Sequence, residues 1–360
     1  MGLFKEIFEL ANDSFGMIEG SAYHYIKESI EKNKLMKLCG KNYFEILDEI
    51  EKVKDCKDEI ESLKASGHTH IVVTEAENKI LQLIEDDPRV LRIIDKNGNN
   101  IPYLALKNDL LNVAKDCLIR DKLACTMDLN NRERDDFLSC AIRKGIDDIV
   151  YTALNDDFYS TYQNEFGQNM GMIAAYNRKI DYALKALDNP IASTQQDDRG
   201  QNIGLIAAIL CIESVTMKAL DNETARRQQD EYGRNIGIMS SKVKMKNCIS
   251  KALDDEIASC QQDEYGRNLG MYCAIDGFDE LTMKALDNFK ASTQQDDNQE
   301  NIGMFAARNC SKEVYEKAKQ NPVAVLQLNL DGERMSDFAK LYGKEERTKS
   351  ISEDYSEEMI

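Results

Sequence analysis

The chain has 360 residues, enough for two ordinary domains or one long repeat array, and its 42% hydrophobic and 31% charged residues can bury a core. The formal net charge of −18 argues against a general nucleic-acid binder, because phosphate contacts need a basic surface, and it disfavours anionic membranes. The simplest interpretation is a solvated acidic surface, although such a charge would also suit a basic protein partner.

The N-terminal region, residues 1–68, shows no internal repeat and is predicted to be helical. Within residues 42–65 the apolar residues recur at spacings of three and four, which predicts one amphipathic helix face. These residues are Phe44, Leu47, Ile50, Val53, Cys56, Ile60 and Leu63. The region is interpreted as a helical cap on the rest of the chain or, alternatively, as a module that binds a partner or forms an oligomer through residues 42–65. Residues 64–70 are interpreted as a linker-like break.

The following part of the chain repeats at a fixed interval, which is the most informative feature of the sequence. Five units open with an N-x-G triplet, and four of them continue with a K-A-L triplet and then Q-Q-D. The evenly spaced asparagines that open the first triplet are Asn169, Asn202, Asn235, Asn268 and Asn301. Chance does not keep so many residue types in one register over five units.

One unit predicts two short helices followed by an extended loop. Asn202 is a good N-cap for an apolar helix over residues 203–209, and a second helix is expected from Glu213 or Ser214 until the pattern breaks after Leu220. The polar stretch beyond it ends in turn residues. Such short helices cannot form a core alone, so the units must stack. A glycine inside every first helix costs about 1 kcal/mol against alanine, which predicts a close approach of neighbouring elements there. The repeated glutamine pairs are expected to bond along the stack.

Weaker units extend the array in both directions. Residues 95–154 and 331–343 carry degenerate copies, and residues 77–94 fit the second helix of a capping half-unit. The array is therefore predicted to span residues 77–343, strongest over 164–310, with about seven or eight units. Residues 344–360 are charged and weakly apolar, which predicts a frayed or disordered tail.

The register resembles the ankyrin repeat, whose unit has this same length and reads D-x-x-G-x-T-P-L-H-x-A-A before its second helix. Asp197, Gly200 and the pair Ala207-Ala208 match that pattern, whereas N-x-G-M or a close variant replaces T-P-L-H, and Gln299 replaces one turn glycine. The resemblance implies an all-α, ankyrin-like helical repeat solenoid with a helical N-terminal region. It also implies that loop tips and first helices bind a partner protein.

No motif for catalysis, metal or cofactor binding is present, so catalytic residues, metal ligands and cofactors are all predicted to be absent and the protein is not expected to be an enzyme. The three histidines, His24, His68 and His70, lie outside the repeats, and the last two are interpreted as a solvated pair in the linker. Acidic pairs recur in every unit and are more simply turn residues than general acids. An enzyme with its active site in residues 1–68 is an alternative that so short a segment disfavours.

The ten cysteines include no C-x-x-C pair, and several stand in apolar helical patterns where a free thiol behaves as a small hydrophobe. The sequence also lacks a signal-peptide pattern and any apolar stretch of roughly 18 residues. A reducing compartment is predicted: the cytoplasm, or a host cytoplasm if the protein is a delivered effector.

The partner-binding surface is predicted at the loop tips and the ends of the first helices. These positions vary on a constant frame and are rich in aromatic residues and arginine, which are over-represented at binding hot spots. The candidate residues are Phe166, Gln168, Tyr176, Arg199, Gln201, Tyr232, Arg234, Tyr265, Arg267 and Asp276. The favoured function is a protein-interaction scaffold or adaptor. The alternative is an acidic inhibitor that mimics nucleic acid and blocks a basic cleft, which would need acids clustered on one face and salt-sensitive binding.

Overall fold

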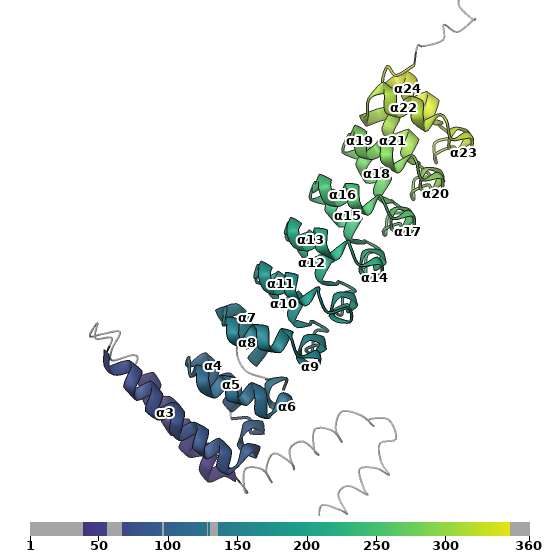
Figure 1. The fold of residues 1–360 in the computed structure, drawn as a ribbon. Coiled ribbons are helices and arrows are strands. Elements are labelled where there is room, and N and C mark those ends of the chain that lie inside the picture. The colour runs from purple at the N-terminus through teal and green to yellow at the C-terminus, as the bar shows by residue number, and fades with distance from the viewer. Residues whose placement is uncertain (1–38, 56–66, 96, 128, 130–135, 346–360) are drawn as a thin grey trace, which may run out of the picture. The chain divides into compact units, whose positions relative to one another are not determined.

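A computed structural model describes residues 39–55, 67–95, 97–127, 129 and 136–345, and every regular element in these residues is helical (Figure 1). The chain divides into two compact units, Met1–Ala153 and Leu154–Ile360. Both contain stacked helix pairs, which confirms the predicted all-α repeat fold.

The first unit contains a helix over residues 39–55 whose buried side differs from the predicted one. Its buried apolar residues follow spacings of four and three along one side: Cys39, Tyr43, Ile46, Ile50 and Val53. Phe44 was predicted on this side, but it is 57% exposed because it lies about 100° around the helix from Tyr43. The predicted continuation over residues 56–65 lies outside the described residues.

The next helix, α3 (Gly67–Asp86), is 20 residues long and corrects two expectations. The predicted linker over residues 64–70 is wrong where Gly67 to His70 begin α3, and the expected short second helix of a half-unit is instead the later part of this long one. The two helices are joined by an ion pair between Lys79 and Glu49 at 2.5 Å. Ile80 and Ile84 of α3 are fully buried.

The rest of the first unit contains the two weak repeat units that the sequence predicts. Asn100 caps α4 by accepting from the Tyr103 amide at 3.1 Å, and Asp136 caps α7 in the same way. Gly145 ends α7 in the left-handed conformation. The elements are η1 (Pro88–Arg92), α4 (Ile101–Lys107), α5 (Leu111–Arg120), α6 (Lys122–Cys125), α7 (Phe137–Lys144) and α8 (Asp147–Leu154).

The second unit repeats one arrangement of first, second and third helices along the chain, and Figure 1 shows the third helices aligned along one side. The first helices are α10 (Met170–Tyr176), α12 (Ile203–Ile209), α15 (Ile236–Lys242), α18 (Leu269–Ile275) and α21 (Ile302–Asn309). The second helices are α11 (Ile180–Ala186), α13 (Glu213–Ala219), α16 (Lys246–Ala252), α19 (Asp279–Ala285) and α22 (Lys312–Ala318). The short third helices are α9 (Asp157–Thr161), η2 (Ala192–Thr194), α14 (Glu223–Arg227), α17 (Glu256–Cys260), α20 (Phe289–Thr293) and α23 (Pro322–Leu326). A final first helix, α24 (Met335–Leu341), follows.

The third helices were not predicted, because that stretch was assigned to an extended loop. The signal that could have revealed them is a capping residue: Asn222 accepts from the Ala225 amide at 3.0 Å and so begins α14. The other boundaries of this unit agree with the sequence, since α12 and α13 begin at Ile203 and Glu213.

The repeated asparagine has two tasks. Asn202 Oδ1 accepts from the Leu205 amide at 2.9 Å, which confirms the predicted N-cap of α12. Its Nδ2 donates to the carbonyl of Ala225 and to Gln228 Oε1, both at 2.8 Å. Because Asn202 is fully buried, each of these polar atoms needs a partner, and the side chain fastens the first helix to the third helix of its unit.

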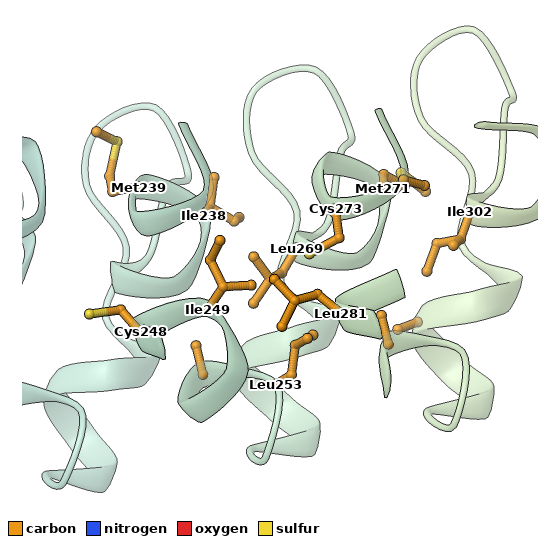
Figure 2. Packing of buried hydrophobic residues seen from close by; sticks show 14 of the residues in the cluster. Ile238, Met239, Cys248, Ile249, Leu253, Leu269, Met271, Cys273, Leu281 and Ile302 are labelled. Carbon is orange, nitrogen blue, oxygen red and sulfur yellow. The ribbon is translucent and has the colours of Figure 1, made fainter. Parts of the chain in front are cut away.

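The apolar core lies between successive helix pairs. Figure 2 shows Ile249, Leu269 and Leu281 of neighbouring units facing one another. The helical glycine sits in this contact: a Cβ on Gly204 would lie 2.5 Å from both Ala219 Cβ and Ile236 Cδ1. The predicted close approach is confirmed, and the approaching atoms are side chains of the unit's own second helix and of the next first helix.

Polar side chains also join each unit to the next. Lys218 of the K-A-L triplet donates to the carbonyl of Leu184 at 2.7 Å and pairs with Asp188 at 2.6 Å. Of the glutamine pair, Gln228 donates back to Thr194 O at 2.5 Å and Gln229 forward to Gln262 O at 3.0 Å. The predicted bonding of the glutamines along the stack is therefore confirmed.

Candidate protein-binding surface

Each loop tip of the second unit is held by a buried aspartate. Asp230 Oδ1 accepts from the amides of Tyr232 and Arg234 at 3.0 and 2.9 Å, and Gly233 takes a positive φ of 72°. The recurrence of D-x-x-G thus follows from the turn that it builds. Asp230 is buried and its oxygens are used within the turn, so it is a structural residue, as predicted.

The tips are also bonded to one another. The Glu231 amide donates to Arg199 O at 2.9 Å, and the Glu264 amide donates to Tyr232 O at 2.9 Å. The same bond joins the Asp198 amide to Phe166 O at 3.2 Å. The tip backbones therefore form one continuous hydrogen-bonded row, which fixes the side chains that they carry.

Four of the predicted residues occupy the same position on successive tips, one repeat apart. Phe166, Arg199, Tyr232 and Tyr265 are all exposed. The Arg234 guanidinium lies 4.5 Å from the centroid of the Tyr232 ring, a cation–π distance that steadies the ring. The structure thus brings these residues together as one row of large side chains.

A second exposed row accompanies the first. One residue before each of these four side chains stands an exposed acid, and the next tip carries another. The acids are Glu165, Asp198, Glu231 and Glu264, followed by Asp297. The tips therefore present carboxylates beside aromatic rings.

The remaining candidate residues are hydrogen-bonded within the array or partly buried in it. Tyr176, at the end of α10, is exposed, and its hydroxyl donates to Gln201 Oε1 at 3.0 Å. Gln201 is buried and so supports Tyr176 more than it is presented itself. Burial of the phenol raises the pKa of Tyr176, which stays a hydrogen-bond donor. Gln168 is partly exposed.

Three charged candidates form ion pairs within the chain. Arg234 contacts Asp230 at 2.6 Å, Arg267 contacts Asp296 at 3.2 Å, and Asp276 contacts Lys244 at 3.2 Å. The two aspartates that hold the arginines are buried. Substituting either arginine would leave a buried carboxylate without its partner, so these side chains stabilise the tips as well as lining them.

Known proteins were compared with the chain by sequence and by structure. No family model matches the sequence, and no curated protein matches it at a significant level. Among solved structures, the ankyrin repeat domain of Bcl-3, a member of the IkappaB protein family, matches with a TM-score of 0.50 and 14% identity over 62% of this chain and 100% of its own. An ankyrin repeat domain from Acinetobacter baumannii AYE matches with a TM-score of 0.45 and 12% identity over 51% of this chain and 97% of its own.

The chain has the ankyrin-repeat fold. This rests on the first of these likenesses together with the regular stacking of helix pairs and hydrogen-bonded tips. The ankyrin array of this chain lacks T-P-L-H, and its buried asparagines join the helices of each unit instead.

The sequence missed a polar cluster at the centre of the ankyrin array. The Tyr272 hydroxyl donates to Asp263 Oδ2 at 2.5 Å, and Lys242 Nζ lies 5.1 Å from the Tyr272 ring centroid and 3.6 Å from the same carboxylate oxygen. Burial and the nearby Asp263 carboxylate raise the pKa of Tyr272. The sequence does contain a signal for this cluster: Tyr272 occupies a repeat position at which other first helices carry an apolar residue, Ile206 or Met239.

The sequence also missed an apolar row on the third helices. Each of these side chains is exposed and large: Phe158, Ile191, Ile257, Phe289 and Val323. Ile191 directly precedes η2, and the other four lie in third helices, which were not predicted. Phe289 stands one residue before the repeat position that the other four share. These side chains form a second exposed apolar surface, separate from the tips.

In the described part of the chain, no three His, Cys, Asp or Glu side chains gather as a metal site, and no helix has both the length and the apolar character needed to cross a membrane. His24 and the side chains of His68 and His70 lie outside the described part. Of the nine described cysteines, only Cys211 is exposed.

Proposed function

We propose that the protein is an interaction scaffold or adaptor that binds a partner protein through the tips and first helices of its ankyrin array, and that it is not an enzyme. The observation that carries the proposal is variation on a fixed frame. The asparagine caps, tip aspartates and glutamine bonds recur from unit to unit, whereas the exposed tip position changes from Phe166 to Arg199 to Tyr232. The backbone of a frame held this firmly has little entropy left to lose on binding.

The chemistry of the tips indicates what the partner carries. Exposed aromatic rings favour an apolar contact at the centre of an interface, and the adjacent row of carboxylates favours Lys or Arg on the opposing surface. The net charge of −18 would speed the approach of such a basic partner. We therefore expect a basic protein surface, with neither nucleic acid nor a membrane as the ligand.

The test is capture from a native lysate with mass spectrometry, using two matched triple variants as baits. The tip variant carries Phe166→Ala, Tyr232→Ala and Tyr265→Ala. The control variant removes three side chains of comparable size from the third-helix row: Ile191→Ala, Ile257→Ala and Phe289→Ala. Arg234 and Arg267 are left in place because their buried partners would be unpaired. Both variants are first compared with the wild type by circular dichroism.

The expected result is one protein captured by the wild type and by the control, and lost by the tip variant. Loss with the control and retention by the tip variant would place binding on the third helices and refute the proposed surface. Capture of the partner by both variants would indicate that neither surface binds it. Residues 1–68 would then be the next candidate, and the alternative of an enzyme places its active site in the same residues.

The acidic tip row favours a second candidate, an inhibitor that mimics nucleic acid and occupies a basic cleft. Under it, affinity for the captured protein should fall steeply with salt, and double-stranded DNA should compete for the same cleft. Binding that persists between 50 and 500 mM salt (about a threefold change in Debye length) and is indifferent to DNA would exclude it.

Two further expectations accompany the proposal. We place the protein in a reducing compartment, the cytoplasm or a host cytoplasm, where its thiols would remain reduced. Self-association through residues 42–65 stays a prediction; up to residue 55 the apolar side of that segment is buried within the chain, and Phe44 is the exposed aromatic residue.

A further inference from the structure

One repeat position near the end of the first helices carries very different side chains in successive units. It belongs to the surface proposed to bind the partner. Its occupants, one repeat apart, are Tyr176, Ile209, Lys242, Ile275 and Arg308. The three polar side chains among them differ in how their hydrogen bonds are satisfied.

Two of these polar side chains find an acceptor within the array. Tyr176 donates to Gln201 at 3.0 Å, and Arg308 donates to Glu300. Gln201 and Glu300 occupy one shared repeat position, directly before the capping asparagine. A polar side chain at the end of a first helix is therefore normally bonded to the residue at this position, either in its own unit or in the next.

Lys242 lacks such an acceptor, because the position carries Arg234 in its own unit and Arg267 in the next. Lys242 Nζ lies 3.6 Å from the Asp263 carboxylate, beyond hydrogen-bond distance, and donates no hydrogen bond within the described residues. An ammonium group has three donors and no acceptor. All three are thus available to an acceptor that a binding partner supplies.

The ammonium group of Lys242 is nevertheless held in place by aromatic rings. It lies 5.1 Å from the ring centroid of Tyr272 and 5.9 Å from that of Tyr265, both cation–π distances. The Tyr272 ring is itself fixed, because its hydroxyl donates to Asp263 at 2.5 Å. A lysine restricted in this way has less side-chain entropy to lose when it binds a ligand.

The charges around Lys242 are separated by depth. The three cations of this part of the array are partly exposed, whereas the acids that they contact are buried. The side chains of Arg234, Lys242 and Arg267 are 20%, 28% and 29% exposed, and those of Asp230, Asp263 and Asp296 are 0%, 0% and 1% exposed. A partner would therefore meet the cations first, which favours a negatively charged group at this place.

We propose that Lys242 binds the carboxylate of an Asp or Glu side chain of the partner, within the otherwise basic surface expected opposite the tips. The inference rests on the proposed binding by tips and first helices, and it specifies one contact of that interface. The exposed acids Glu231 and Glu264 stand on the adjacent tips, so basic residues should flank the partner's acid. A basic residue in its place would face three cations and would be rejected.

The test begins with a selection from short random peptides displayed on phage through their C-termini, so that no terminal carboxylate is available. The full chain is the bait, and the enriched peptides are sequenced. We expect them to share an Asp or Glu flanked by Lys or Arg. One enriched peptide is then synthesised with an amidated C-terminus, together with a counterpart whose acid is replaced by the corresponding amide.

Calorimetry gives the affinity of both peptides for the wild type and for Lys242→Met. The wild type should bind the amide peptide at least about tenfold more weakly than the acid peptide. Lys242→Met should bind the acid peptide more weakly by a similar factor and discriminate little between the two, because the pair is already broken. The control Lys244→Met removes an equal charge two residues away, where Lys244 contacts Asp276 at 3.2 Å, and should discriminate as the wild type does. Circular dichroism checks the fold of both variants.

Equal discrimination by the wild type and Lys242→Met would overturn the inference, and so would enriched peptides that contain no acid. A tip variant limited to Phe166→Ala and Tyr232→Ala, which leaves Tyr265 beside Lys242, separates this failure from that of the proposed function. Peptides lost by the tip variant but indifferent to Lys242→Met would leave the proposed function standing and refute this contact alone. Discrimination through Lys242 that persists unchanged in the tip variant would support the contact and count against the tips.

Discussion

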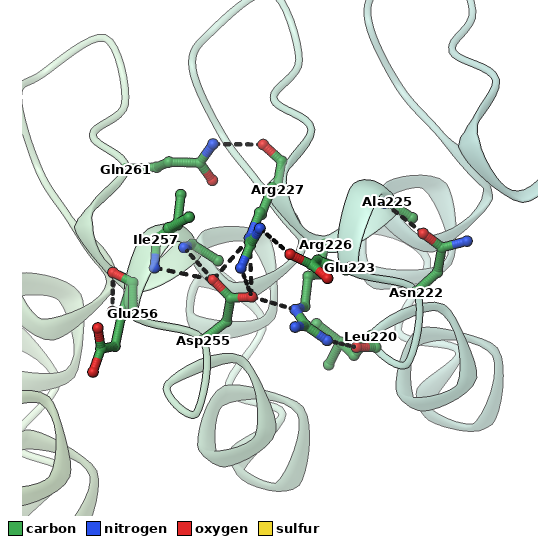
Figure 3. Close-up of polar contacts among 12 residues, drawn as sticks. Leu220, Asn222, Glu223, Ala225, Arg226, Arg227, Asp255, Glu256, Ile257 and Gln261 are labelled. Carbon is green, nitrogen blue, oxygen red and sulfur yellow. Dashed lines mark hydrogen bonds and ion pairs between the residues drawn. The ribbon is translucent and has the colours of Figure 1, made fainter.

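Asp255→Ala is expected to destabilise the array, because Asp255 holds an ionic contact where the neighbouring units have a neutral one. Third helices of successive units are joined by an asparagine that donates to a serine hydroxyl, as between Asn222 and Ser193 at 2.9 Å. At one junction Arg226 replaces the serine and Asp255 replaces the asparagine, with a contact of 2.5 Å (Figure 3). Arg227 adds a second contact at 3.0 Å.

The magnitude follows from the contacts that are lost. Burial would raise the pKa of Asp255, but hydrogen bonds from Arg227, the Ala258 amide and Arg226 outweigh it and lower the pKa to about 2. Against an ordinary value of 3.8, that shift corresponds to about 2 kcal/mol of stability. Asp255 also caps α17 through the Ile257 and Ala258 amides. Because the Ala258 bond already contributes to the pKa shift, the cap adds less than a full capping energy of about 1 kcal/mol, and Asp255→Ala should cost about 2–3 kcal/mol. The arginines are 25% and 29% exposed, so water limits the cost of leaving them unpaired.

The matched control is the double variant Arg226→Ser, Asp255→Asn, which recreates the neutral junction of the neighbouring units and keeps the cap. It should lie within about 1 kcal/mol of the wild type, whereas Asp255→Asn alone should cost about 2 kcal/mol because both guanidiniums lose a carboxylate. Arg226→Ser alone should cost less, since Arg227 still pairs with Asp255.

The contribution of Asp255 should depend on pH with a definite sign. Its pKa is lower in the folded state, so its stabilisation is present above the unfolded value near 4 and is lost as the pH falls toward 2. The stability difference between the wild type and Asp255→Asn should therefore shrink between pH 5 and pH 2, whatever the other carboxylates contribute to both proteins.

The assay is urea denaturation followed by circular dichroism at a series of pH values, with differences taken between midpoints at a shared slope. Equal destabilisation by Asp255→Ala and by the double variant would refute the reasoning, since the junction would then not matter. A difference from Asp255→Asn that is constant from pH 5 to pH 2 would refute the ionic account.

Three further predictions concern single side chains. Gly204→Ala should destabilise by about 1–3 kcal/mol in urea denaturation despite its better helix propensity, because its Cβ would lie 2.5 Å from two side chains; an unchanged midpoint would contradict this. Ser241→Ala should stabilise by about 1 kcal/mol, because the buried hydroxyl has no hydrogen-bond partner within the described residues; a lower midpoint would contradict it. Thiol labelling with mass mapping should modify Cys211 in the native state but Cys273 and Cys310 only after unfolding, because they are buried and burial raises their pKa to about 12 and about 11.

The sequence determined the repeating frame because its signals are local and recur. An asparagine followed by a short apolar run predicts a capped helix, as Asn202 and α12 show, and D-x-x-G predicts the tip turn at Asp230. The glycine at 204 also marked a close approach, because a costly residue kept in every unit needs a packing reason. The candidate tip residues could be placed in one row because their spacing is the repeat length.

The tertiary structure alone decided what contacts what. It selected Tyr43 over Phe44 for the buried side of the N-terminal helix, since both choices fit a spacing of three or four until a neighbour is present. It also made Gln201 a support for Tyr176, and paired Arg226 with Asp255. These outcomes depend on side chains that belong to different repeat units or to separate helices. Helix periodicity shows which residues share one side of a helix. It does not show which other helix or repeat unit packs on that side and buries those residues.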